Sequence, residues 1–586
     1  MDSPLSYTSP MITEELVLAR GISSVSLAPE SIGGYIGTKL SRGSFGDADF
    51  GVSGRVGTRY SHNGSIGTSA ARLTFADNRH RLTLLAEVDD GDDIDTPEGS
   101  RVPSHLHRER YDVSYAHRGD RFNVMLFAGA LDTEDTGTAA LPMDIVFIDT
   151  ELYGAQFGIE LSDAVEIEGR VAYNDVDHVM DNHSMRQPPS PMRQRLNTAQ
   201  GDGSLFSLSA IIDSGEAELH IGVDGIAAEH NSVITNPNAA AFAVTNFAGV
   251  SRDLVSGFVE WHKETGTGNV ELGMRVNRVA TNAGDVGAAG MMDMMAMNTG
   301  MLADAFNSAD RDLSWTTFDA VAKYRYAVAE GREWSFELGS KTRAPSYQEL
   351  YLWLPMQATA GLADGRSYIG NLDLDAERST EIVIGYTAIA GRFGFSPQIF
   401  YRDVDNYIQG VPSANATANR VSTMMSGVAP LQFDNVDARI WGVDASWRYD
   451  LTNHLLLDGN ISITRGRRSD IDDNLYRLSP YNGSIGVTYR GQRWDLKTEL
   501  IGYADQDYVS STNNESGTAG YWRANVAYSW NPTPAFRLEA RVDNLLDESY
   551  QDHVAGINRA GGMSIPVGTR LFGAGRTVTA GLSYAF

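Results

Sequence analysis

The stretch that decides the fold of this chain is its end, where residues 577–586 read TVTAGLSYAF. Apolar side chains stand at every second position from Val578 to Phe586, and small or polar residues stand between them. Such an alternation predicts a β-strand with one apolar face and one small or polar face. Residues 522–530 repeat the pattern, with tryptophan at both ends. Strands of this kind suit a β-barrel in lipid, because its outside is apolar and its lumen is wet.

The composition agrees with a β-barrel in lipid and argues against a helical membrane protein and a nucleic-acid-binding protein. The 586 residues include 59 glycines but no run of 18 or more apolar residues, so the sequence predicts no transmembrane helix. The mean hydropathy of -0.26 fits a chain in which only every second strand residue faces lipid. The net charge of -28 argues against nucleic acid as a partner. The chain has no cysteine, so no disulfide stabilises it.

The spacing of the strand-like runs predicts the size of the barrel. From residue 45 onward, short turns such as Asp77-Asn78 alternate with long polar stretches. These stretches are 89–106, 180–203, 281–312, 355–376, 411–432 and 504–520. Short turns on one rim and long loops on the other are typical of outer-membrane barrels, and Phe586 at the end of the last strand resembles their C-terminal signature.

The predicted fold class is therefore all-β. About 25 residues per strand and connection gives a transmembrane antiparallel β-barrel of about 22 strands, a size that needs a plug in its lumen. An open edge would leave backbone groups unpaired in lipid. We therefore expect the last strand to pair with the first barrel strand near residues 48–60.

Several segments resemble, in order along the chain, those of the TonB-dependent receptors. Residues 15–21 (ELVLARG) and 32–36 (IGGYI) look like the end of the plug domain of that family, with Ile22 where the family usually has proline. Three later segments resemble motifs of the same family. Residues 341–350 (KTRAPSYQEL) resemble its "R-A-P-S/T-x-x-E-L" segment, and residues 370–381 (GNLDLDAERSTE) resemble its "G-N-P-x-L-x-P-E" segment. Residues 543–550 (DNLLDESY) resemble its "N-L-F-D-x-x-Y" segment.

This resemblance implies how the protein is organised. Residues 1–44 would be the C-terminal remnant of a plug domain, and residues 45–586 the receptor barrel, in the outer membrane of a Gram-negative bacterium. The start Met1-Asp2-Ser3-Pro4 lacks the basic start and apolar core of a signal peptide. We therefore expect a leader, the TonB box and most of the plug to be missing, through truncation or a gene model begun too late.

The resemblance also implies the partners. The full-length form would be energised by the TonB-ExbB-ExbD complex and would be a monomer in contact with outer-membrane lipid. It implies a transport receptor that is not an enzyme and that holds no prosthetic group.

The run His178-Val179-Met180 is the strongest candidate for a metal site. In an extended segment, residues at this spacing place an imidazole and a thioether on the same face, about 7 Å apart along the chain. Both donors suit copper, Cu(I) in particular, far better than Mg²⁺ or Ca²⁺. His183 and Met185 repeat the spacing five residues later. Ordinary loop residues are the alternative interpretation of both pairs.

The surroundings of this run resemble the copper-receptor subfamily of the TonB-dependent receptors. The likeness lies in residues 141–144 (LPMD) and 173–186 (YNDVDHVMDNHSMR). In that subfamily a His-x-Met supplies two barrel ligands to one copper ion, and a Cys-x-x-x-Met of the plug supplies two more. The resemblance therefore implies copper as the bound ion, with His178, Met180 and Met1 as ligands. The cysteine position would fall four residues before Met1.

A second group of thioethers lies in residues 291–301. It comprises Met291, Met292, Met294, Met295, Met297 and Met301. We expect a long loop here, because the run shows no helix-length apolar face. Its thioethers could collect Cu(I) weakly at the barrel mouth, as could His183 and Met185, or could serve only for packing.

His105 and His107 form a third candidate, because two imidazoles at period-2 spacing can bind a divalent metal. Glu109 continues the same face, but Arg108 and Arg110 flank the stretch and repel a cation. We favour solvated loop histidines here.

Rival functions remain open at this point. A ferric-siderophore or other metal-chelate receptor would show aromatic and Arg-rich lumen residues instead of Met–His pairs. An outer-membrane protease or lipase would be a much smaller barrel. A passive porin would not carry plug-like segments. The sequence therefore favours a copper receptor.

Overall fold

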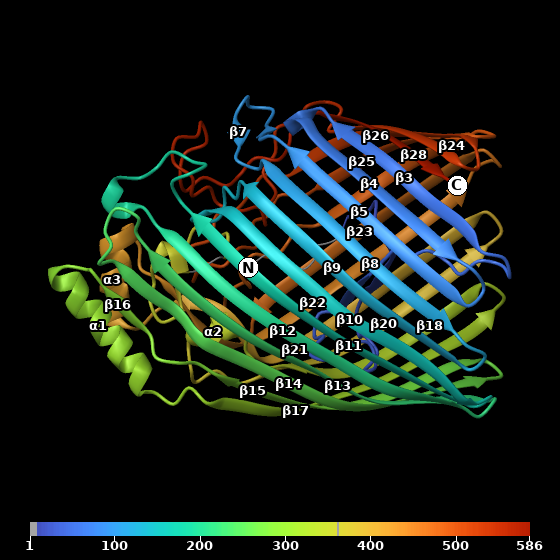
Figure 1. The fold of residues 1–586 in the computed structure, drawn as a ribbon, viewed down its shortest axis with the longest axis horizontal. Coiled ribbons are helices and arrows are strands. Elements are labelled where there is room, and N and C mark those ends of the chain that lie inside the picture. The colour runs from blue at the N-terminus through green and yellow to red at the C-terminus, as the bar shows by residue number, and fades with distance from the viewer. Residues whose placement is uncertain (1–8, 360–361) are drawn as a thin grey trace.

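The computed structural model describes residues 9–359 and 362–586, which form a closed β-barrel (Figure 1). Among these residues, 22 antiparallel strands close the barrel, which confirms the predicted fold class. The first eleven are β3 (Gly51–Ser61), β4 (Ile66–Ala76), β5 (His80–Gly91), β8 (Leu106–Arg118), β9 (Phe122–Thr136), β10 (Asp144–Ser162), β11 (Val165–Asp181), β12 (Leu196–Asp213), β13 (Ala217–Thr235), β14 (Ala243–Thr265) and β15 (Gly268–Asn282). The others are β17 (Leu313–Ala329), β18 (Arg332–Arg343), β20 (Glu377–Ala390), β21 (Phe393–Pro412), β22 (Leu431–Asp450), β23 (Leu455–Arg468), β24 (Asn482–Arg490), β25 (Trp494–Tyr503), β26 (Tyr521–Thr533), β27 (Phe536–Asp543) and β28 (Thr577–Ala585).

Short strands and 3-10 helices lie in the loops. Strand β16 (Gly287–Ala289) pairs with β14, β19 (Tyr368–Ile369) runs parallel to β22, and β6 (Ile94–Asp95) pairs with β7 (Arg101–Val102). The described residues also form the short 3-10 helices η2 (Asn63–Ser65), η3 (Pro191–Arg193) and η4 (Gln357–Thr359).

The barrel closes where its last strand meets its first. Strand β28 pairs antiparallel with β3, beginning with Thr579 opposite Ser61. Two backbone hydrogen bonds between Phe586 and Gly54, of 2.9 and 3.0 Å, extend this pairing to the end of the chain. The predicted pairing near residues 48–60 is confirmed, and the seam leaves no unpaired edge in lipid.

The alternation of the sequence becomes the two faces of the wall. On β28, Val578, Leu582 and Tyr584 point outward and are 38–45% exposed on the isolated protein. Trp522 and Trp530 on β26 are exposed in the same way. In a membrane this apolar outer surface is covered by lipid, which is why large hydrophobic side chains can stand there.

The two rims differ in the way the sequence predicts. Short turns such as 77–79 join strands at one end, while the long loops at the other end carry the helices α1 (Asp293–Ser308), α2 (Tyr347–Tyr351) and α3 (Ala416–Ser426). In the described ranges, no helix has the length and apolarity needed to cross a membrane. One long loop, residues 544–576, falls outside the predicted stretches.

Most of the methionine-rich run is helical, so the loop predicted for residues 291–301 is wrong from Asp293 onward. That residue begins α1, which continues to Ser308. Methionine, alanine and leucine are good helix formers. The apolar face that the run itself lacks comes from Leu302, Ala303 and Phe306, which directly follow it and are buried.

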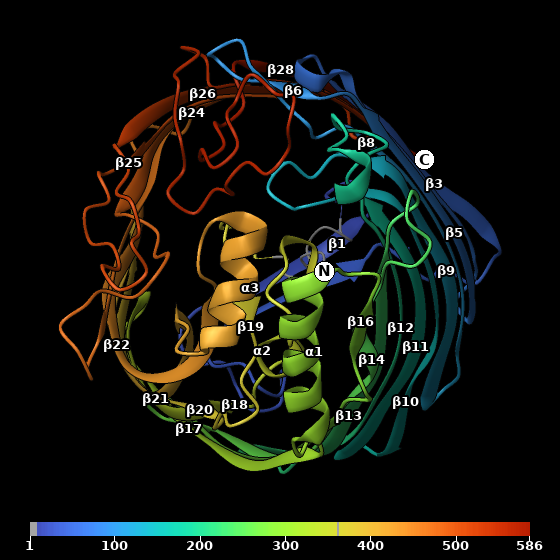
Figure 2. The same cartoon turned by 90° about the vertical axis from the view of Figure 1, so that its left-hand side faces the viewer.

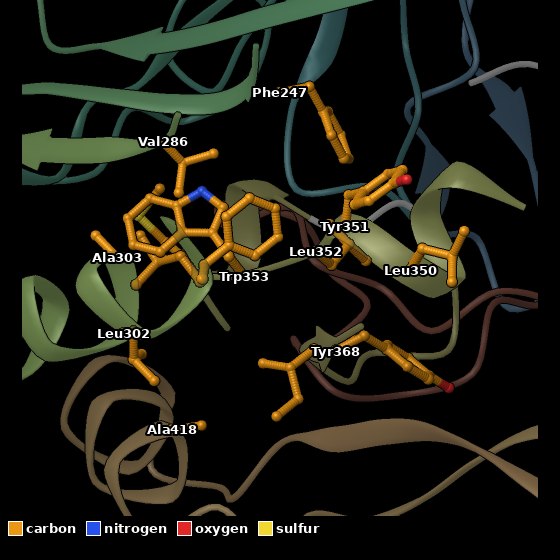
Figure 3. Close-up of a cluster of buried hydrophobic side chains, with 14 of the residues drawn as sticks. Phe247, Val286, Leu302, Ala303, Leu350, Tyr351, Leu352, Trp353, Tyr368 and Ala418 are labelled. Atoms are coloured by element: carbon orange, nitrogen blue, oxygen red, sulfur yellow. The ribbon is translucent and has the colours of Figure 1, made fainter. Parts of the chain in front are cut away.

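Inward-folded loops build a hydrophobic core in the barrel mouth, here called the mouth core (Figures 2 and 3). It comprises buried side chains of α1, α2, α3, the segment after α2 and nearby strands. Trp353 lies within it, and its Nε1 donates a hydrogen bond of 3.0 Å to the carbonyl oxygen of Thr245 on β14. Tyr351 is fully buried, and its hydroxyl donates to the carbonyl oxygen of Arg311 at 2.9 Å. The loops are therefore packed onto the wall by apolar burial and by hydrogen bonds.

The N-terminal segment, residues 9–44, lies inside the ring of strands (Figure 2). It contains a two-stranded antiparallel sheet of β1 (Thr13–Ala19) and β2 (Tyr35–Leu40). Between these strands, the carbonyl oxygen of Val25 accepts a 2.8 Å hydrogen bond from Nε of Arg275 on β15. The division into a plug remnant (1–44) and a barrel (45–586) stays a prediction. Residues 1–8 lie outside the described part of the chain, and so does the candidate ligand Met1.

Trp353→Ala is expected to loosen the mouth core without opening the barrel. Truncating a buried tryptophan costs on the order of 3–5 kcal/mol, and the loss falls on the loops packed around it. Limited proteolysis should therefore cut residues 344–376 faster, while heat-modifiable migration on a gel, which reports the closed barrel, stays unchanged.

The matched control is Trp522→Ala, which removes the same side chain from the lipid-facing wall. It should leave the proteolysis of the loops as it is. Equal cleavage rates in wild type and Trp353→Ala would contradict the role given to the mouth core.

Candidate metal site

His178 and Met180 lie on β11 and point into the lumen. In the barrel wall His178 stands opposite Ile148 of β10 and Ala199 of β12. Their odd-numbered neighbour Tyr173 is exposed on the outer face, so the even-numbered positions face inward. His178 is half-buried, whereas Met180 is only 7% exposed. The structure thus brings the imidazole and the thioether to one face, as the spacing predicts.

Both side chains line a cavity of about 710 Å³, here called the lumen cavity. Its walls come from β10 to β14, from residues 141–143, from the start of α2 and from Ala358 and Thr359. Two further donors line it, the thioether of Met143 and the imidazole of His230 on β13. Sequence reasoning did not name either as a ligand. Met143 lay within the quoted LPMD segment, whereas nothing in the sequence near His230 gave a signal.

Met143 is held in place by a buried ion pair. Arg186 donates to Asp144 through both Nε and Nη2, and both side chains are almost fully buried. Nη1 of Arg186 also donates to the carbonyl oxygen of Leu141 at 3.0 Å. The hydroxyl of Thr138 donates to the carbonyl oxygen of Met143 at 2.6 Å. Because a buried pair of this kind is costly to break, it fixes the loop that carries the thioether.

Met143 and Met180 belong to one small buried apolar cluster, together with Ile145 and Ile148. Met143 is 3% exposed. The two sulfur atoms therefore lie in a dry part of the wall, while the imidazole of His178 reaches the cavity from the same strand.

His183 and Met185 lie in the loop after β11 and do not line the lumen cavity. Oδ1 of Asp181 accepts the backbone N–H of His183 at 2.9 Å and so turns the chain away from the wall. Sδ of Met185 lies 3.3 Å from Nε2 of His105. The structure thus joins two candidates that the sequence treated separately.

His105 is also tied to the loop between β5 and β8, because its Nδ1 lies 2.7 Å from Oδ1 of Asp93. Burial raises the pKa of Asp93, but hydrogen bonds from the His105 ring and from the backbone of Ser104 outweigh it and hold the pKa below its ordinary value. His105 lies in a loop, as we expect from the sequence, and its side chain is 25% exposed while Asp93 and Met185 contact its ring. His107 is more exposed and faces Asp90 at 3.1 Å.

The methionines of the 291–301 run, of which Met291 and Met292 precede α1, divide into a partly buried and an exposed group. Met291 and Met295 pack against the mouth core. The others are among the most exposed apolar side chains of the protein and comprise Met292, Met294, Met297 and Met301. Residues three and four apart share one face of a helix, so Met294, Met297 and Met301 form a stripe of thioethers that faces solvent at the mouth.

Comparisons with known proteins agree with this architecture. The chain superposes on the structure of the copper transporter OprC with a TM-score of 0.86 at 20% identity, covering 100% of this chain and 90% of that one. The FrpB iron transporter from Neisseria meningitidis (F3-3 variant) gives 0.70 at 13% identity, covering 98% and 88%. A mutant of the ferric enterobactin receptor PfeA from Pseudomonas aeruginosa gives 0.70 at 14% identity, covering 98% and 85%. At these identities the likeness shows a shared fold.

A search of curated proteins gave no match. The family model described as "TonB dependent receptor-like, beta-barrel" matches residues 41–545. That match spans most of the chain, and the protein therefore belongs to the TonB-dependent receptors, which are transport receptors of the Gram-negative outer membrane and not enzymes.

Proposed function

We propose that this receptor takes up copper and that His178 and Met180 bind the ion in the lumen cavity. The observation that carries the proposal is that these two side chains line one cavity together with a second buried thioether, Met143. Thioether and imidazole donors favour copper, Cu(I) above all, over hard cations. The shared fold with a copper transporter supports the proposal without adding to its chemistry.

The lining of the cavity favours a soft ion. Apolar side chains such as Ile148, Val176 and Phe247 line the cavity, and so do oxygen donors such as Asp202 and Glu229. Mg²⁺ and Ca²⁺ bind oxygen ligands and retained waters, so a hard cation would make no use of the thioethers. A Cu(I) ion, by contrast, is well served by two or three soft donors, and these line the cavity together.

A ferric chelate is the second candidate substrate, because iron transporters and a siderophore receptor share the fold. A cavity of 710 Å³ would hold a small chelate. Arg252 is a cationic residue of its lining, but both carboxylate oxygens of Glu30 already accept from its Nη2 at 2.8 Å. Burial raises the pKa of Tyr347, so its phenol is a poor anionic ligand for a hard ferric ion. These features favour the bare copper ion.

As a TonB-dependent receptor, the protein is expected to draw energy for transport from the TonB complex. In the copper proposal this energy drives release of the ion, because an ion held by several soft donors dissociates slowly on its own. Met1 stays a predicted third ligand, since it lies outside the described residues. The protein is predicted to be a monomer.

The remaining thioethers are proposed as a route of entry. The solvent-facing stripe of Met294, Met297 and Met301 stands at the mouth, where an incoming ion first meets the protein. The pair of Met185 and His105 offers one sulfur and one nitrogen in the loops. Both are expected to be weaker sites than the lumen cavity, because the thioethers of the stripe are exposed to solvent and the loop pair presents only two donors.

Replacing both proposed ligands should weaken copper binding sharply. His178→Ala with Met180→Ala is expected to lower the Cu(I) affinity at least about tenfold, or ~1.4 kcal/mol, because the ion loses one imidazole and one buried thioether. The measurement is competition with a chromophoric Cu(I) chelator, using the purified receptor in detergent.

The control for this pair is His105→Ala with Met185→Ala, which removes the same two residue types from the loops. That variant should keep the tight site. An unchanged affinity in His178→Ala with Met180→Ala would refute the copper assignment, and tighter binding of a ferric chelate than of copper would support the second candidate.

Met143→Leu tests the ligand that only the structure reveals. Leucine keeps the volume, so the fold loses less than about 1.5 kcal/mol, but it cannot donate a sulfur lone pair. We expect a weaker Cu(I) affinity with unchanged heat-modifiable migration. If the affinity stays at the wild-type value, Met143 serves only to pack the wall.

Met294→Leu, Met297→Leu and Met301→Leu together should leave the equilibrium affinity of the lumen cavity unchanged and slow its loading at limiting copper. The reason is that the stripe lies outside the cavity but on the approach to it. Stopped-flow measurement of loading separates the two effects. Equal loading rates would show that the stripe has no part in capture.

A further inference from the structure

A second group of metal-binding side chains lies on the lumen wall, away from the lumen cavity. The group, here called the His–Glu cluster, comprises His220 on β13 and Glu260 and His262 on β14. One ligand atom from each of the three lies within 4.8 Å of the others. In the sheet His220 stands directly opposite Glu260, and His262 follows two positions further on the same face.

The cluster faces the lumen and contacts the N-terminal segment. The backbone N–H of Ser26 donates to Oε2 of Glu260 at 3.0 Å, and the hydroxyl of Ser26 donates to Oε1 at 2.8 Å. Glu260 is only 2% exposed, whereas the intervening wall residue Val259 is exposed on the outer face. The side chains of His220 and His262 are 24% and 37% exposed, so an ion in the lumen can reach both.

The cluster lies at the opposite end of the barrel from the lumen cavity. His220 is close to the short turn 214–216, whereas Ser232 on the same strand is level with the proposed copper ligands through Ala199 of β12. Twelve residues at about 3.3 Å each separate the two levels by roughly 40 Å along the tilted strand. The two sites therefore share no ligand.

The donors suit a divalent ion of the first transition series. Two imidazoles and one carboxylate are a donor set for Zn²⁺ and Cu²⁺, and the set contains no sulfur. Nε2 of His262 lies 2.8 Å from Oε1 of Glu260, where a metal ion can replace the shared proton. The two hydrogen bonds from Ser26 would then orient the carboxylate as supporting partners of a ligand.

Nε2 of His220 is available to bind a metal ion. Its Nε2 is buried and makes no hydrogen bond of acceptable geometry among the described residues, although Oε1 of Glu218 lies 3.0 Å away. Glu218 stands opposite His262 and adds a further carboxylate at the edge of the cluster.

Two nearby cations are already paired with other carboxylates. Nη1 and Nη2 of Arg275 donate to the two carboxylate oxygens of Asp224, and Lys323 pairs with Glu271 at 3.0 Å. A third cation, Lys341, interacts with the charge of Glu260 from a distance and donates to the hydroxyl of Ser31 at 3.3 Å. The carboxylates of Glu218 and Glu260 give the cluster itself a negative charge, which attracts a cation.

We propose that His220, Glu260 and His262 form a second metal site, which binds a divalent first-row transition ion such as Zn²⁺ or Cu²⁺ where the wall meets the N-terminal segment. It does not rest on the copper proposal, because it uses other residues at another level of the barrel.

The test is titration of the purified chain in detergent with Zn²⁺ by calorimetry and with Cu²⁺ by electron paramagnetic resonance. His220→Gln with His262→Gln should weaken one stoichiometric site about a hundredfold and remove the nitrogen couplings of two imidazoles from the Cu²⁺ spectrum. Heat-modifiable migration verifies that the variant still forms a closed barrel.

The matched control is His80→Gln with His117→Gln, which removes another pair of adjacent imidazoles, with Nδ1 atoms 3.4 Å apart, at the short-turn rim. This control and His178→Ala with Met180→Ala should both keep the site. A wild-type chain without a stoichiometric Zn²⁺ site, or an affinity that is unchanged in His220→Gln with His262→Gln, would overturn the proposal. Loss of the site in His178→Ala with Met180→Ala would show instead that the ion binds at the lumen cavity.

Discussion

The structure depends on one constraint, which is that every backbone N–H and C=O of the wall must find a partner where no water is available. In lipid an unsatisfied backbone group costs several kcal/mol, so a sheet can span the membrane only if it has no free edge. The pairing of β28 with β3 satisfies this condition, and the bonds between Phe586 and Gly54 extend it to the last residue. Closure then divides every strand into an outward apolar face and an inward face that is free for chemistry.

Closure also determines where the remaining chain can go. The connections at the short-turn rim leave little room for extra residues, so inserted sequence collects in the loops of the other rim. Those loops fold inward and bury Tyr351 and Trp353 in a core of their own. Tyr351 joins two loops through the carbonyl of Arg311, and Trp353 joins the core to the wall through the carbonyl of Thr245. The mouth is therefore narrowed by a packed core whose position is set by the barrel beneath it.

The fold was readable from the sequence because its main signal is local. Alternation of period 2 at residues 577–586 predicts a strand without knowledge of any neighbour, and repetition of that signal predicts the barrel. The contribution of α1 to the mouth core was missed because Leu302, Ala303 and Phe306 follow the methionine run and acquire a common face only once α1 forms. The loop 544–576 was missed because its polar and glycine-rich sequence gives no periodic signal, and part of it resembles a family segment.

The candidate sites likewise divide into those that local sequence reveals and those that only the folded structure reveals. His178 and Met180 could be named from the sequence because they are two residues apart on one strand, and the period of a strand alone places them together. Met143 reaches the same cavity from the loop before β10, and His105 meets Met185 across 80 residues of chain. The pairing of His220 with Glu260 depends on the register of β13 and β14. Such neighbours become visible only when the register of the sheet is known.

The wall of a closed barrel is rigid, so movement of a bound ion requires that something other than the wall changes. The N-terminal segment is the element suited to this, because it lies in the lumen as a separate piece of chain. It is held there by the buried side chains of Ile22 and Val25, which pack against the wall, and by polar contacts at discrete points. Arg252 pairs with Glu30 at the edge of the lumen cavity, and Glu260 accepts from Ser26 at the His–Glu cluster. A shift of this segment would free a cation beside the lumen cavity and would release a carboxylate at the cluster. Repulsion at the first site and attraction at the second would both favour movement of a positive ion from the mouth toward the short-turn rim.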